Sequence, residues 1–195
     1  MSDDDVLPYP NLLIPQYVFI LTTPSLSAQH ASARSKLQEA LVADEMAPYY
    51  KLIASLDLGL TVDLTTLEAK NKESLESIAT ALTSAESTEG ETEISDALRN
   101  KANYLTRIGE RELAVAAQEL ALEKSSAIGA RIDICLTLVR LGMFWGDEGL
   151  VKTWLEKTEK LIDEGGDWDR RNRLKVYKGV QKVGVRDFKV SADIL

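Results

Sequence analysis

Residues 131–142 read RIDICLTLVRLG. Asp133, Thr137 and Arg140 form a narrow polar stripe at i, i+4 and i+7 of a predicted helix. The other positions are almost all apolar, namely Ile132, Ile134, Cys135, Leu136, Leu138, Val139 and Leu141. A helix with so little polar surface must be covered on several sides. The pattern therefore predicts the inner helix of a stack of helices.

The sequence also predicts helices of similar length before and after this helix. Helices are expected near 94–108, 110–128, 131–142 and 147–163, followed by a last pair that begins at Asp167. The turns at 109–110, 146–147 and 186–187 lie 37 and 40 residues apart. Helix–turn–helix units of about 34 residues or slightly more are typical of tetratricopeptide-like arrays. The predicted fold class is all-α, with tetratricopeptide-like helix-hairpin repeats (a right-handed α-solenoid) and an irregular N-terminal arm.

The first half of the chain has a different organisation. All five prolines lie within the first 48 residues, and the following 147 residues contain none. Residues 1–24 are predicted to be an irregular arm that packs on something, because Val6 and the run to Leu21 are too apolar for a free tail. N-terminal helices are predicted for 25–85, an acidic linker for 86–93, and the helical-repeat region for 94–195. Thr65 and Glu68 have the spacing of a capping box at the start of one helix.

The amino-acid composition excludes several classes of function. The chain of 195 residues has 23 basic and 31 acidic residues, for a net charge of −8, which argues against a nucleic-acid or anionic-membrane binder. A single Cys, Cys135, and a single His, His30, exclude a disulfide framework and a Cys/His zinc site. No run approaches the ~20 apolar residues of a membrane span, and the acidic start lacks the positive end of a signal peptide. We predict no catalytic, cofactor-binding or metal-binding residue, and a cytosolic or nuclear location.

One segment of this acidic chain carries a net positive charge. Residues 167–189 hold eight Lys or Arg and three Asp, a net charge of +5 that leaves −13 for the rest of the chain. Arg171, Lys175, Lys178 and Lys182 follow each other along one face of a helix, which we call the basic stripe. The pattern fits either a solvated helix face or a docking surface for an acidic protein segment. The predicted partner-binding residues are Trp168, Arg170, Arg171, Arg173, Lys175, Lys178 and Lys182.

Several segments resemble one known family. They are EMAPYYK at 45–51, GARID at 129–133, LTLVRLG at 136–142, GGDWDRRNR at 165–173 and VRDFK at 185–189. Together they resemble the family of non-ATPase subunit 7 of the proteasome regulatory particle lid. The related subunit 1 of the signalosome is less similar, because the EMAPYYK segment favours the proteasome family.

This resemblance implies a scaffold and not a catalyst. Members of the family carry an N-terminal helical-repeat arm and a C-terminal PCI domain, and they form hetero-oligomers with other lid subunits in the cytoplasm and nucleus. They also contact a small, very acidic tether protein. The sequence departs from the family between Leu56 and Thr92, and it ends inside a predicted helix at Leu195, where the family's repeats and PCI domain are expected to follow.

The sequence thus predicts a non-catalytic scaffold subunit of the 26S proteasome lid that supports ubiquitin-dependent protein degradation through protein contacts. The alternative is a free-standing helical-repeat adaptor that binds peptides or proteins in a concave groove, for example a signalosome-type PCI subunit. That adaptor requires the stripe of Asp133, Thr137 and Arg140 to face an open groove. Contact between this stripe and a packed neighbour favours the scaffold.

Overall fold

The computed structural model describes residues 8–88 and 90–194. Within these ranges every regular element is a helix, so the predicted all-α helical-repeat class is confirmed. The chain forms two compact units, residues 1–117 and 118–195, which are described in turn. Val6, Glu89 and Leu195, on which parts of the arm, linker and C-terminal predictions fall, lie outside the described residues.

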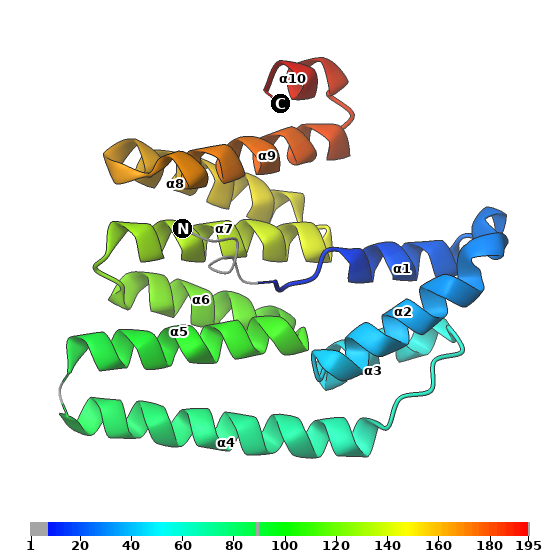
Figure 1. The fold of residues 1–195 in the computed structure, drawn as a ribbon, viewed down its shortest axis with the longest axis horizontal. Helices are drawn as coiled ribbons and strands as arrows, with labels where there is room; N and C mark the ends of the chain where they lie inside the picture. The colour runs from blue at the N-terminus through cyan, green and yellow to red at the C-terminus, as the bar shows by residue number, and fades with distance from the viewer. Residues whose placement is uncertain (1–7, 89, 195) are drawn as a thin grey trace. The chain divides into compact units, whose positions relative to one another are not determined.

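Within its described residues, the first unit contains five α-helices and two short 3₁₀ segments. Its elements are α1 (Leu13–Thr22), η2 (Pro24–Gln29), α2 (His30–Ala43), α3 (Ala47–Ile53), η3 (Ala54–Leu56), α4 (Leu64–Thr88) and α5 (Glu91–Ile108), and α6 (Arg111–Lys124) begins within it. Helices α4 and α5 lie side by side and antiparallel (Figure 1).

Part of the predicted irregular arm is helical. Pro15 sits in the first turn of α1, where a backbone N–H has no intrahelical partner and its absence costs little. The apolar sequence of α1 packs on α2, and Ile14 is completely buried. Tertiary packing therefore gives this proline-containing segment a regular structure.

The helices on either side of the acidic segment extend into it. Helix α4 ends at Thr88 and α5 begins at Glu91, so the regular structure covers much of 86–93. Glu91 and Glu93 fall in the first turn of α5, where negative charge interacts favourably with the helix dipole. The division of the chain at 86–93 stays a prediction.

The predicted capping box at Thr65 and Glu68 is wrong by two residues. Helix α4 begins at Leu64, and the Thr66 backbone N–H donates to Asp63 Oδ1 at 3.1 Å. Asp63 also accepts from the Thr66 hydroxyl, and these hydrogen bonds hold the pKa of its carboxyl below the usual range. An Asp immediately before a helix satisfies an orphan N–H and adds charge where the dipole favours it.

The second unit is a stack of helical hairpins. After the end of α6 it contains α7 (Ile128–Trp145), α8 (Glu148–Gly165), α9 (Trp168–Gly184) and α10 (Phe188–Ile194). Ile132, Leu138 and Val139 of α7 have no exposed surface, so its prediction as an inner helix is confirmed. Gly146 ends α7 in the left-handed conformation with φ 65°, and Asp147 Oδ1 accepts from the Leu150 N–H at 2.9 Å to begin α8.

Cys135 lies inside this stack and should be chemically inert. Its side chain is fully buried, and burial raises the pKa of the thiol to about 11. Since the thiolate is the nucleophile, we expect a maleimide or disulfide reagent at pH 8 to label the folded chain at least ~100-fold more slowly than the chain in denaturant. Labelling at the same rate in both states would contradict this burial.

Candidate interaction site

The seven predicted partner-binding residues all belong to α9. The helix begins after Gly165-Gly166, and Asp167 Oδ1 accepts from the Arg170 backbone N–H at 2.8 Å. This hydrogen bond is the main cause that lowers the pKa of Asp167. Trp168, the first helical residue, leaves 79% of its surface exposed. A large exposed aromatic side chain at a helix start is available to another protein.

Two of the predicted residues are held inside the unit. Arg170 donates from Nε to Asp133 Oδ1 at 3.1 Å and from Nη2 to Asp133 Oδ2 at 2.5 Å, and it also pairs with Asp167. Arg173 Nη2 donates to Asp133 Oδ1 at 2.9 Å, and its Nε lies 2.9 Å from Asp169 Oδ2. The arginine side chains are only 14% and 19% exposed. Asp133 thus joins α7 to α9 through two arginines.

The polar stripe on α7 therefore faces a packed neighbour. Asp133 is occupied by α9, Thr137 is buried and donates to the Asp133 carbonyl at 3.0 Å, and Arg140 lies beside Tyr177 of α9. Burial lowers the pKa of Arg140 and raises that of Tyr177. Among the described residues, α9 occupies the surface along this stripe that the adaptor interpretation required to be an open groove.

Two members of the basic stripe attach α9 to α8. Arg171 donates to the carbonyls of Ile162 and Gly166 at 2.9 and 3.1 Å, near the C-terminus of α8, and lies 3.7 Å from Asp163. Donors at this position satisfy carbonyls that the helix leaves without partners. Lys178 pairs with Glu159 of α8. Both side chains therefore have partners within the unit.

The other two members of the basic stripe, Lys175 and Lys182, make no such contact with α8 among the described residues. Lys175 is exposed and Lys182 is half-buried, and neither has an ion pair within the residues that the structure describes. These two lysines and the exposed Trp168 at the start of the helix form an accessible surface, which we call the outer stripe. Sequence periodicity placed all these residues on one helix, but it did not separate the paired arginines from the free lysines.

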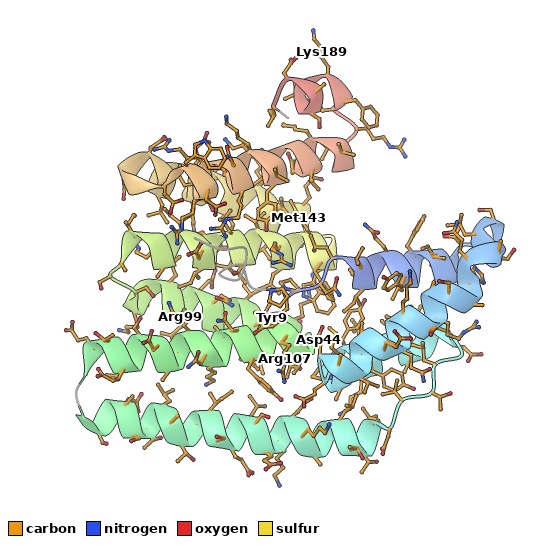
Figure 2. All side chains as sticks on the ribbon, in the orientation of Figure 1. Tyr9, Asp44, Arg99, Arg107, Met143 and Lys189 are labelled. Atoms are coloured by element: carbon orange, nitrogen blue, oxygen red, sulfur yellow. The ribbon has the colours of Figure 1, made fainter. Side chains whose placement is uncertain are left out.

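A polar cluster in the first unit was not predicted from the sequence. Asn71 Nδ2 donates to the Glu45 carbonyl at 2.9 Å and to Tyr104 Oη at 3.1 Å, and Arg107 pairs with the Glu45 carboxylate. Arg107 lies close to Asp44, whose pKa burial raises (Figure 2). The signal was present, because Asn71 occupies a core position in the helical pattern of α4. The cluster joins α4 and α5 to the loop before α3.

The loop before α3 is part of the EMAPYYK segment at 45–51, one of the segments that resemble the family. Met46, Ala47 and Tyr49 are buried, and a Cβ built on Gly109 would come 2.7 Å from Tyr49 Cβ and 2.9 Å from Met46 Cε. Gly109 has φ 74°, so both its conformation and its surroundings favour glycine. The EMAPYYK segment therefore has a packing role in this unit.

Residues 8–88 and 90–194 contain no group of three or more His, Cys, Asp or Glu side chains that could hold a metal ion. In the same part of the chain, none of the helices has both the length and the apolarity to cross a membrane.

The fold and this site define a tetratricopeptide-like helical-repeat protein. Comparison with known sequences makes the assignment specific: a sequence model described as "26S proteasome subunit RPN7" matches residues 62–195, and the chain belongs to this family. Its relatives include the 26S proteasome non-ATPase regulatory subunit 6 of Caenorhabditis elegans, 34% identical over 190 residues that cover 95% of this chain and 46% of that protein.

Two fungal relatives support the same assignment. The 26S proteasome regulatory subunit rpn7 of Schizosaccharomyces pombe is 35% identical over 192 residues, which cover 95% of this chain and 48% of that protein. RPN7 of Saccharomyces cerevisiae is 31% identical over 217 residues, which cover 99% of this chain and 51% of the relative. The chain thus spans about half the length of the curated relatives it matches, and the predicted family resemblance is confirmed.

Proposed function

We propose that the chain acts as a non-catalytic scaffold subunit of the proteasome regulatory particle lid and supports ubiquitin-dependent degradation through protein contacts. The observation that carries this proposal is membership of the RPN7 family over residues 62–195. Its partners are other lid subunits in a hetero-oligomer of the cytoplasm and nucleus, with no cofactor and no reaction of its own. The relatives' names describe regulatory, non-ATPase subunits, which supports a role without catalysis.

The physical basis of the proposal is a stack of rigid helices with distinct attachment surfaces. Each hairpin of such an array contacts its neighbours, so the array holds its surfaces in fixed positions. The outer stripe combines Trp168 with Lys175 and Lys182 on an otherwise acidic chain. A positive surface of this kind attracts acidic segments and repels basic ones. We propose that it contacts lid subunits or a small acidic tether protein.

A pull-down tests the scaffold and the outer stripe together. The tagged full chain is incubated with a cell extract that contains 26S proteasomes, and bound proteins are identified by mass spectrometry. We expect the wild type to recover lid subunits, and the double variant Lys175→Glu/Lys182→Glu to recover at least about fivefold less at physiological salt, because it replaces attraction by repulsion.

The matched control is Lys36→Glu/Lys70→Glu, which makes the same change of charge at two exposed lysines of α2 and α4. It should recover lid subunits as the wild type does, and circular dichroism should show equal helicity for all three proteins. If the wild type recovers no lid subunit, the scaffold proposal fails. If both double variants recover lid subunits equally well, only the outer stripe is excluded.

A further inference from the structure

Helices α3 and α4 of the first unit form a groove that is lined mainly by apolar surface. Its volume is about 480 Å³, and it lies where α3 packs on α4 (Figure 1). The apolar side chains that line it are Ala47, Pro48, Leu75 and Ala79. The charged side chains at its edge are exposed and form two ion pairs, Lys51 with Glu68 and Lys72 with Glu76. An apolar centre with a polar edge is typical of a recognition site.

Asn71 of α4 also lines this groove, and one atom of its amide lacks a partner. The residue is only 6% exposed, and its Nδ2 donates to the Glu45 carbonyl at 2.9 Å and to Tyr104 Oη at 3.1 Å. Because a carbonyl can only accept, these contacts fix the orientation of the amide. Oδ1 is then buried without a hydrogen-bond partner among residues 8–88 and 90–194. A buried acceptor without a donor is costly, so it favours a ligand that brings one.

The apolar lining and the unpaired acceptor together define the chemistry of the ligand. The lining favours an apolar body, and Asn71 Oδ1 requires a hydrogen-bond donor. A lysine would lose the hydration of its charge in such a groove, and a hydroxyl or peptide group brings an acceptor that needs a partner of its own. The indole ring of tryptophan is apolar except for one N–H, which only donates. Tryptophan is also enriched at the energetic centres of protein interfaces.

We propose that the groove between α3 and α4 binds an indole ring, presented by a tryptophan side chain of a protein segment, and that Asn71 Oδ1 accepts its N–H. The ring packs on the apolar lining, and the ion pairs at the edge lie next to the polar backbone of the segment. This inference rests on the proposed scaffold function for the protein nature of its ligand. It gives the first unit an attachment point of its own.

A capped tryptophan tests the site directly. The probe is N-acetyl tryptophan amide with a fluorine on the ring, titrated with the full chain and followed by fluorine NMR, in which the chain's own tryptophans give no signal. We expect a Kd of about 1 mM or lower. The analogue that is methylated at the indole nitrogen keeps the ring but cannot donate, so it should bind at least about fivefold more weakly.

Two substitutions separate the acceptor from the groove. In Asn71→Leu the probe and its methylated analogue should bind equally, because the acceptor that distinguishes them is gone. Ala79→Phe keeps Asn71 and its hydrogen bonds but fills the groove from an exposed position, so it should weaken binding of the probe at least about tenfold at an unchanged melting temperature. The matched control is Ala69→Phe, the same change at an exposed position of α4 outside the groove, which should bind as the wild type does.

Four results would overturn the proposal. They are failure of the folded wild type to bind the probe, equal binding of the probe and its methylated analogue by the wild type, equal binding of the probe by Ala79→Phe and Ala69→Phe, and binding of free indole without binding of the capped tryptophan. The last would assign the groove to a small aromatic molecule. If lid subunits are still recovered in the pull-down, the scaffold function stands while the tryptophan site is rejected.

Discussion

Gly142→Ala is expected to lower the free energy of unfolding of the second unit by about 2 to 3 kcal/mol, although alanine is the better helix former. A Cβ built on Gly142 comes 2.7 Å from Val151 Cγ2, 2.9 Å from the Val151 backbone N and 3.2 Å from the Asp147 carbonyl O. Two of these atoms belong to the backbone of the turn and of α8, so no side-chain rotation relieves the clash. Urea unfolding followed by circular dichroism at 222 nm measures the loss.

Gly184→Ala is the matched control, because Gly184 is also helical and its added Cβ meets nothing within 4 Å. There alanine should be neutral or stabilise the chain by up to about 1 kcal/mol. Equal stability of Gly142→Ala and Gly184→Ala would show that α7 and α8 do not approach each other closely at Gly142.

Asp133→Lys should also cost about 2 kcal/mol of stability, for an electrostatic reason. It removes the carboxylate that holds Arg170 and Arg173 and places a third cation between them. The arginines keep their contacts with Asp167 and Asp169, and Asp133 is 39% exposed, so the loss stays below that of a fully buried pair. The midpoint of urea unfolding should fall, and raised salt should restore part of it by screening the repulsion.

Glu156→Lys provides the comparison, because it makes the same charge change at an exposed position of α8 and should alter stability by less than about 0.5 kcal/mol. Adding Arg170→Glu to Asp133→Lys should recover part of the loss, since the pair is then restored with reversed sign. If Asp133→Lys is as stable as Glu156→Lys, the ion pairs of Asp133 contribute nothing to the packing of α9 on α7.

Much of the fold could be predicted because its signals are local. The apolar run at 131–142 predicts an inner helix, and Asp147 and Asp167 begin helices where the sequence changes from turn to helical pattern. Predictions that rested on one short segment alone were less accurate. Proline content predicted an irregular arm, yet α1 forms there because α2 covers its apolar side. The sequence predicted a cap at Thr65, and the hydrogen bond that Asp63 accepts shows that the cap lies two residues earlier.

The sequence by itself determined that the chain is helical, that its repeats recur every 37 to 40 residues, and that positive charge gathers on one helix. These properties follow from residue spacing and helix geometry within single elements. Only the tertiary structure decided which cations are available. Arg170 and Arg173 find their carboxylate 37 and 40 residues earlier in the chain, whereas Lys175 and Lys182 project from the same helix without an ion pair in its described surroundings. The state of a charged side chain depends on the groups that folding brings within a few ångströms, and its own segment does not specify them.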